Sequence, residues 1–420
     1  MKPMQPESAL RNTLAAKPPA TANPRLALNK PIEPRIQKFL TSPLRRLILL
    51  CMAFATMCVH LHTRLYMQEL QGRDYRYYLR MEATRSLEPA PAPFAYRWVP
   101  HKIIPYVPLP PKRVHEVLNV FAMCATAWVI TEWLVRLGYD VRLVLPVVVL
   151  GFTWSTFGGV YFLWGRFATE PVTYLLLALG LYLARFGALW QLVIVTIVAT
   201  LSREQALLLV PYYYLVRRGV VSSRQALGGT LLLGAVALAT FVFVRLVTPT
   251  TGDYRLTMEI AQNLTTKFGS FGGLATLVVS LLTHSGLIPL VLVLLPIQSL
   301  EGAKRNPAIA FWLMGNFGLA IIGGAETDRI AFSAFPAELF LMCWVLTRIG
   351  FAWTIEWMPA LVVFVLGQVA MSGTFADGRV HLPNYTPFWC ATSAMLWTIA
   401  LWLCCRGRLS GRARLHRVES

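Results

Sequence analysis

The residues best suited to chemistry lie in a polar interval between apolar segments, in residues 72–78 (GRDYRYY) and 93–101 (PFAYRWVPH). Asp74 is flanked closely by arginines, and such neighbours favour the ionised carboxylate that can accept a proton. Arginine guanidinium groups bind phosphate through two parallel hydrogen bonds. Aromatic residues separate these charges. The interval therefore combines arginines that could hold phosphate with a carboxylate that could do chemistry.

The rest of the chain is far more apolar than a soluble protein. Of its 420 residues, 56% are hydrophobic and 14% are charged, whereas soluble domains carry about 25% charged residues. Apolar runs of roughly 20 residues, the length that spans a bilayer, recur along the chain. Composition therefore predicts an all-α, polytopic transmembrane helical bundle of about ten to twelve helical segments.

The formal net charge of +19 has a membrane explanation. Basic residues cluster at the ends of apolar runs, where they orient spans and attract anionic lipid. There is no basic stripe on a soluble domain, so nucleic acid is not expected as a partner. The seven cysteines lie in or beside apolar runs and form neither a metal-ligand pattern nor a disulfide framework.

Three regions follow from this organisation. Residues 1–46 are predicted to be a disordered basic cytoplasmic tail, residues 47–405 the transmembrane domain, and residues 406–420 a second basic cytoplasmic tail. Nine Lys and Arg residues precede the first span, and this positive-inside bias places the N-terminus in the cytoplasm. The first span then leads into the first extracytoplasmic loop, residues 64–113. An even number of crossings leaves both termini cytoplasmic.

Further spans or half-spans are expected at residues 114–134, 143–164, 168–183, 189–200, 206–216, 225–247, 271–300, 309–323, 330–346, 357–371 and 388–405. Residues 248–267 are expected to be an outer loop. The two short segments at 189–200 and 206–216 meet at Ser202-Arg203-Glu204. The sequence leaves open whether they are two spans or a re-entrant hairpin.

This topology places an unusual set of ionisable residues on the outer face: Asp74, Arg97, His101, Arg166, Glu170, Arg203, Glu204, Asp253, Asp328 and Arg329. Ionisable groups at or inside spans are costly and usually face a cavity or one another. Several helix ends repeat the same combination of an arginine near an acid. The repetition favours a site for an anionic, lipid-anchored substrate.

Short motifs in these positions resemble those of the GT-C superfamily of integral-membrane glycosyltransferases. The first loop has an Asp followed by tyrosines at residues 74–78, and residues 93–100 (PFAYRWVP) run toward the second span. Residues 202–206 (SREQA) resemble an Arg-Glu-Thr-like element of the family. Asp328-Arg329 with Pro336 resembles its late Asp-Arg…Pro segment. The resemblance covers roughly residues 45–405.

The resemblance implies transfer of a sugar from a polyprenyl-phosphate donor to an extracytoplasmic acceptor, which is a glycolipid, a polysaccharide or a protein. Asp74 would be the general base, and Arg97, Arg203 and Arg329 would hold the donor phosphate. The substrate would be lined by Tyr75, Tyr78, Tyr96, Trp98, His101, Glu204 and Asp328. The same resemblance implies a bacterial inner membrane and a role in the cell envelope.

The chain also departs from the family. Many members carry two adjacent acids in the first loop, whereas Arg73 precedes Asp74 here. This departure puts a metal bound by an acid pair in doubt. No cofactor is required by the motifs, although a divalent metal is left open.

Each candidate residue has a structural alternative. Asp74 could be an interfacial acid paired with Arg73 or Arg76, and Arg203-Glu204 an ion pair at two helix ends. Glu170 begins a helical run, as a capping residue would. His101 could be interfacial, and His284 is expected to be a packed core histidine.

Two functional alternatives also remain. A transporter or flippase of lipid-linked saccharides would have no chemistry of its own and would show internal repeats. A non-catalytic scaffold in envelope assembly would tolerate substitution of the Asp74 loop.

Overall fold

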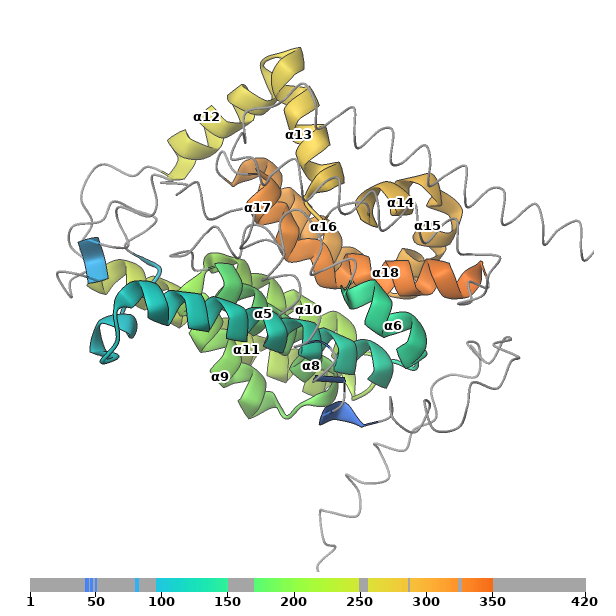
Figure 1. The fold of residues 1–420 in the computed structure, drawn as a ribbon, viewed down its shortest axis with the longest axis horizontal. Coiled ribbons are helices and arrows are strands. Elements are labelled where there is room, and N and C mark those ends of the chain that lie inside the picture. The colour runs from blue at the N-terminus through green and yellow to red at the C-terminus, as the bar shows by residue number, and fades with distance from the viewer. Residues whose placement is uncertain are drawn as a thin grey trace, which may run out of the picture.

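The computed structural model describes residues 42–44, 46, 47, 50, 80–82, 96–149, 170–248, 256–285, 288–323 and 327–349. All regular elements in these ranges are helices (Figure 1). Most of the expected first span and both of the expected last spans lie outside the described residues. So do Asp74, Tyr75, Tyr78, Arg166 and Asp253.

One group of helices follows the segment that contains Arg97 and His101. It consists of α5 (Pro111–Arg136), α8 (Glu170–Phe186), α9 (Leu189–Ser202), α10 (Leu209–Arg217) and α11 (Ser223–Val247). Helix α8 packs against α5, α9 and α10, while α11 packs against α9 and α10. Ser222 caps α11 by accepting a hydrogen bond from the amide of Gln225, as N-cap serines do. The helices agree closely with the expected segments.

A second group follows along the chain: α12 (Leu256–Phe268), α13 (Phe271–Thr283), α14 (Ile288–Leu294), α15 (Pro296–Arg305), α16 (Pro307–Ile322), α17 (Thr327–Ala331) and α18 (Phe335–Arg348). Helix α6 (Val141–Val148) packs against both α5 and α18. It lies with the C-terminal end of α18 at the right of Figure 1. The two groups also meet where α16 packs on α10.

The expected boundaries were wrong in two places. The expected outer loop at 248–267 contains most of α12, and the expected long segment at 271–300 is divided among α13, α14 and α15. Pro296 begins α15, where its missing N–H costs no helical hydrogen bond. Ser270 caps α13 by accepting from the Gly273 amide. These local stop and start residues divide an apolar stretch that hydropathy alone treats as continuous.

Within the part of the chain that the structure describes, two helices are long and apolar enough to cross a membrane: residues 113–136 of α5, and α11. A third candidate is the pair formed by residues 260–268 and 271–282, which is bent by 101°. Helix α11 exposes many large apolar side chains, including Leu231 and Leu246, which is the surface expected of a helix facing lipid. The described residues thus support a membrane protein.

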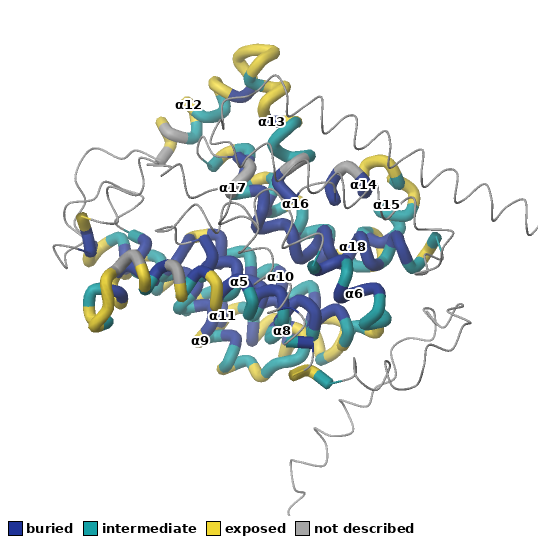
Figure 2. Tube along the Cα trace, viewed as in Figure 1, coloured by how far each residue is buried: buried dark blue, intermediate teal, exposed yellow. Residues whose placement is uncertain are grey.

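The core is rich in aromatic side chains. Trp312 on α16 is fully buried, and its indole donates to the carbonyl of Ser333 at 3.0 Å. Tyr174 on α8 meets the rings of Phe332 and Phe335 edge-on. Figure 2 shows that burial is concentrated along α16, α18 and the middle of the first group. These contacts join the two groups of helices.

Basic residues occupy the C-terminal ends of α5, α10 and α18. Arg136 lies over the rings of Tyr182 and Phe186, and Arg217 donates to the carbonyl of Gly187 at 2.6 Å. Arg348 pairs with Glu301 at 2.7 Å. These are ends that the topology assigns to the cytoplasm, where basic residues are favoured.

The close packing of α10 and α11 depends on Gly229. A Cβ at this position would lie 2.6 Å from the hydroxyl oxygen of Tyr213 and 2.9 Å from its ring carbon Cε1. We expect Gly229→Ala to lower the free energy of unfolding by about 1–3 kcal/mol, because overpacking moves buried side chains. Thermal unfolding of the detergent-solubilised protein measures this loss.

Gly228 on the same helix is the matched control, since a Cβ there meets nothing within 4 Å. Gly228→Ala should leave stability unchanged or raise it by up to about 1 kcal/mol through helix propensity. Equal unfolding temperatures for the two variants would contradict this packing.

Candidate functional site

The segment that contains Arg97 is held on the end of α9. The amide of Trp98 donates to the carbonyl of Leu201 at 2.9 Å. Its indole donates to the Thr248 hydroxyl at 3.0 Å, at the end of α11. The hydroxyl of Ser202 lies 3.4 Å from the carbonyl of Val99. Residues 96–101 are therefore placed against the ends of α9 and α11, although they are far from both in sequence.

The helical backbone is interrupted at Arg203, between α9 and the short helix η5 (Glu204–Leu208). Arg203 has extended backbone angles, φ −159° and ψ 147°, so its side chain leaves the helix line. Its guanidinium lies 2.9 Å from Glu170 at the start of α8, and both side chains are at most 4% exposed. This ion pair is buried, which distinguishes Arg203 and Glu170 from ordinary solvated capping residues. Breaking a buried pair is costly because a charge remains in the interior.

Glu204 lies in the field of three arginines. It is exposed, yet the surrounding protein desolvates its carboxylate and so opposes its ionisation. The charges of Arg97, Arg203 and Arg245 outweigh this effect, and the pKa of Glu204 is lowered below its usual value. Glu204 is therefore ionised at neutral pH. We call Arg97, Arg203, Arg245 and Glu204 the arginine cluster.

Aromatic side chains cover one side of the arginine cluster. The guanidinium of Arg245 lies 4.7 Å from the ring centre of Tyr96 and 3.6 Å from that of Phe241. Trp98 meets Phe243 edge-on at 6.1 Å. Arginine over an aromatic face is stabilised by the ring quadrupole. The cluster thus combines positive charge with aromatic surfaces, which is the combination expected from the sequence.

The short helix α17 lies next to η5, beside the arginine cluster. The Ser333 hydroxyl, just after α17, donates to the side-chain carbonyl of Gln205 at 3.1 Å. The amide of Gln205 lies 3.5 Å from the carbonyl of Ile330. Asp328 and Arg329 belong to α17, but their side chains lie outside what the structure describes. The backbone therefore brings the Asp328-Arg329 segment next to η5.

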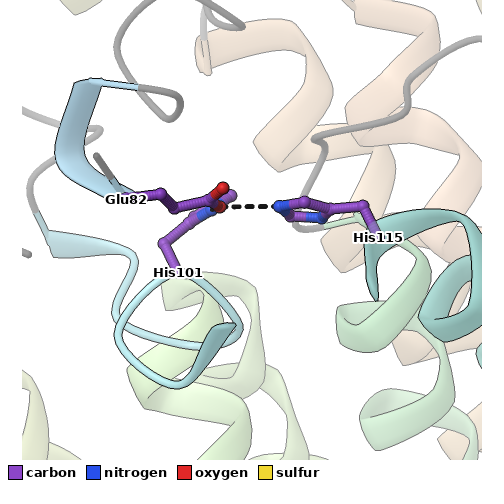
Figure 3. A group of neighbouring side chains, drawn as sticks. All are labelled: Glu82, His101 and His115. Carbon is purple, nitrogen blue, oxygen red and sulfur yellow. Dashed lines mark hydrogen bonds and ion pairs between the residues drawn. The ribbon is translucent and has the colours of Figure 1, made fainter. Parts of the chain in front are cut away.

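Three further ionisable residues adjoin this region: Glu82, His101 and His115 (Figure 3). His101 Nδ1 lies 2.7 Å from Glu82 Oε1, and His115 Nε2 lies 2.6 Å from the same oxygen. All three side chains are at most 1% exposed. The two imidazole rings are tilted, with centres 5.4 Å apart. We call these residues the Glu-His-His cluster.

Burial and pairing set the charge states in the Glu-His-His cluster. Burial lowers the pKa of His101 to about 4, although the hydrogen bond with Glu82 opposes this shift. Burial alone would raise the pKa of Glu82, but the hydrogen bonds with His101 and His115 lower it overall. At neutral pH the carboxylate of Glu82 is therefore ionised, while the His101 imidazole is neutral.

Sequence reasoning did not identify Glu82 or His115. His101, which the sequence placed among the substrate-lining residues or at the membrane interface, is buried and bonded to a carboxylate. The only signal available was three metal-binding or proton-transferring residue types within 34 positions, at 82, 101 and 115. No motif has that spacing, and three segments of different structure bring the residues together.

His284 is buried, as expected for a packed core histidine. Its Nε2 lies 2.8 Å from Oε1 of Glu338, and both side chains are at most 1% exposed. Nearby, Lys267 donates to the carbonyls of Ala320 and Ile321 at 2.7 and 3.0 Å. These carbonyls belong to the last turn of α16, where a cation is favourable. Both arrangements connect helices of the second group.

Comparison with known proteins gives no relative. No family model matches the chain, and neither a curated protein nor a solved structure is similar to it.

Proposed function

We propose that this protein is an integral-membrane glycosyltransferase of the GT-C type. It takes a sugar from a polyprenyl-phosphate donor and transfers it to an acceptor on the extracytoplasmic side, in a bacterial inner membrane. The observation that carries the proposal is the arginine cluster, in which Arg97, Arg203 and Arg245 surround Glu204 at the ends of α9 and α11. The motifs that resemble the GT-C superfamily add independent support.

The arginine cluster fits a phosphate better than it fits a structural role alone. Arg203 pairs with Glu170, and Arg97, Arg203 and Arg245 all act on Glu204, so three guanidinium groups are concentrated at one place. Arg97 and Arg203 are nearly buried. Charges in such surroundings act more strongly on a bound phosphate than surface charges do. Arginine also offers two parallel donors to phosphate oxygens.

The surroundings of Arg245 fit a lipid-linked donor. On the same end of α11, Phe243, Leu246 and Val247 are exposed by 52%, 81% and 52%. A polyprenyl chain lying along this apolar surface would bring its phosphate to Arg245 at the helix end. The rings of Tyr96 and Trp98 lie at the same end and could contact the sugar. The helix therefore supplies both an apolar and a cationic contact.

The chemistry is a displacement at the anomeric carbon of the donor. A carboxylate accepts the proton of the acceptor hydroxyl, whose oxygen bonds to that carbon as the bond to the phosphate oxygen breaks. Negative charge grows on the departing phosphate, and the guanidinium groups stabilise it. We assign the proton transfer to Asp74 in the first extracytoplasmic loop and the binding of phosphate to Arg97, Arg203, Arg245 and Arg329. Glu204 keeps the arginines in place.

The test compares two arginines of one helix. Arg245 lies at the site end of α11, and Arg224 lies at the opposite end. We expect Arg245→Gln to raise the KM for a polyprenyl-phosphate sugar about 10- to 100-fold, since a hydrogen bond to a charged group contributes about 1.5–3 kcal/mol. Arg224→Gln should leave KM unchanged. Transfer of labelled sugar by purified protein in liposomes measures both values, and equal KM values for the two variants would refute this assignment.

A further inference from the structure

The Glu-His-His cluster is assembled from three separate parts of the chain. Glu82 lies in residues 80–82, His101 in the turn before η2 (Ile104–Tyr106), and His115 in the first turns of α5. One carboxylate oxygen and one nitrogen from each imidazole lie within 4.8 Å of one another. Three different backbone segments thus direct metal-binding atoms to one buried point.

We propose that Glu82, His101 and His115 form a binding site for a divalent transition metal, with zinc preferred. Two imidazoles and one carboxylate are a common ligand set for zinc sites that keep a fourth position open. Nitrogen donors favour transition metals, whereas calcium and magnesium prefer oxygen donors only. This site uses none of the residues to which we assigned proton transfer or phosphate binding.

The hydrogen bonds in the cluster leave one strong acceptor unused. Both imidazoles contact Oε1 of Glu82, while Oε2 is buried and has no hydrogen-bond partner among the described residues. Leaving a buried carboxylate oxygen without a partner is unfavourable. A cation between the carboxylate and the two imidazoles would compensate this oxygen as well as bind the rings.

The dimensions of the cluster require only a small adjustment. Zinc binds imidazole nitrogen and carboxylate oxygen at about 2.0–2.2 Å, so tetrahedral ligand atoms lie about 3.4 Å apart. The present contacts of 2.6 and 2.7 Å would therefore lengthen by less than about 1 Å.

The site would join the first loop to the bundle. His101 lies three residues after Trp98, which bonds to the ends of α9 and α11, and His115 belongs to α5. The charge of Glu170, the partner of Arg203, also reaches His101. A metal here would therefore hold residues 80–82 and the turn at His101 against α5, beside the arginine cluster. It would affect that cluster by fixing where its residues lie.

Metal content tests the proposal directly. The full chain is purified in detergent with an affinity tag that contains no histidine, stripped with a chelator, incubated with zinc chloride and desalted. We expect about one zinc per chain by elemental analysis. Glu82→Gln and His115→Gln should each weaken zinc binding more than about 100-fold, because even residues that only support a ligand contribute 10- to 100-fold. Visible absorption of bound cobalt, added in place of zinc, is a second measurement on the unaltered protein.

His284→Gln is the matched control. His284 is also buried against a glutamate, Glu338, but this contact joins two residues rather than the three of the Glu-His-His cluster. The variant should keep the zinc content and affinity of the unaltered chain. The proposal fails if the unaltered chain retains no more zinc than Glu82→Gln, or if His284→Gln loses as much zinc as His115→Gln. If the glutamine variants do not fold, the cobalt spectrum decides, and its absence overturns the proposal.

Zinc binding and sugar transfer are measured separately. A chain that binds zinc but transfers no sugar would retain this site and lose the proposed function. A chain that transfers sugar but binds no zinc would support the proposed function and overturn the zinc site.

Discussion

Arg203→Gln is expected to destabilise the protein by about 3–5 kcal/mol, the usual cost of removing one partner from a buried ion pair. The guanidinium of Arg203 lies 2.9 Å from Glu170, and both side chains are almost inaccessible to solvent. Without it, the carboxylate of Glu170 loses the opposite charge of Arg203 in a poorly solvated place. The unfolding temperature in detergent should fall clearly below that of the unaltered protein.

Two comparisons show whether burial is the cause. The double variant Glu170→Gln/Arg203→Gln removes both charges and should recover a large part of the lost stability, since no isolated charge remains. Arg348→Gln removes a partner of Glu301 from a pair in which both side chains are more than a third exposed, and it should cost less than about 1 kcal/mol. If Arg203→Gln costs no more than Arg348→Gln, the site end of the bundle is not packed as described.

Asp74→Asn has the second large expected effect, and it acts on rate. Asparagine preserves the shape of the side chain but cannot accept the acceptor's proton. Transfer should therefore fall by about 10²- to 10⁴-fold, the usual contribution of a general base. Initial rates at equal protein level measure the loss. The unfolding temperature is measured on the same samples, so that a loss of folded protein is not mistaken for a loss of rate.

Glu204→Gln is the control carboxylate. It lies among the arginines but is not assigned the proton, so its effect on the maximal rate should be much smaller than that of Asp74→Asn. The reverse order would make Glu204 the base.

The sequence predicted the helices of the site well. Periodic apolar runs with clear ends, such as those of α5 and α11, have boundaries within a few residues of the expected ones. The expected loop at 248–267 failed because α12 is polar on much of its surface, so hydropathy did not reveal it. The apolar run at 271–300 failed because capping residues and Pro296 divide it. Capping residues and proline therefore set the helix boundaries between residues 271 and 300, whereas the length of the apolar run was enough to predict those of α5 and α11.

The candidate site was predicted in part. Topology places the ends of α8, α9 and α11 on one face, and the structure brings Arg97, Arg203, Glu204 and Glu170 together there. Topology could not show that Arg203 pairs with Glu170, because the pairing depends on the extended backbone of Arg203. Arg245 was also missed. In the sequence it is an ordinary basic residue near the C-terminal end of an expected helix, and only the packing of α11 places it by Glu204.

The Glu-His-His cluster could not be predicted from sequence in physical terms. Its members are separated by 19 and 14 positions, so they share no helix face and no local motif. The folding of residues 96–106 onto the end of α9 moves His101 toward α5, where His115 lies. Such convergence depends on tertiary hydrogen bonds that a single sequence does not display.

The central claim is that the chain transfers sugar from a lipid phosphate, and one measurement tests it most directly. Purified protein in liposomes receives a labelled polyprenyl-phosphate sugar and an acceptor extract from the cell envelope. The amount of labelled product is then measured, together with the fraction of the remaining donor in each leaflet of the bilayer. The account predicts a labelled acceptor and released polyprenyl phosphate, with transfer reduced at least about 10²-fold in Asp74→Asn. Movement of intact lipid-linked sugar across the bilayer without any labelled product would contradict it and establish a transporter instead.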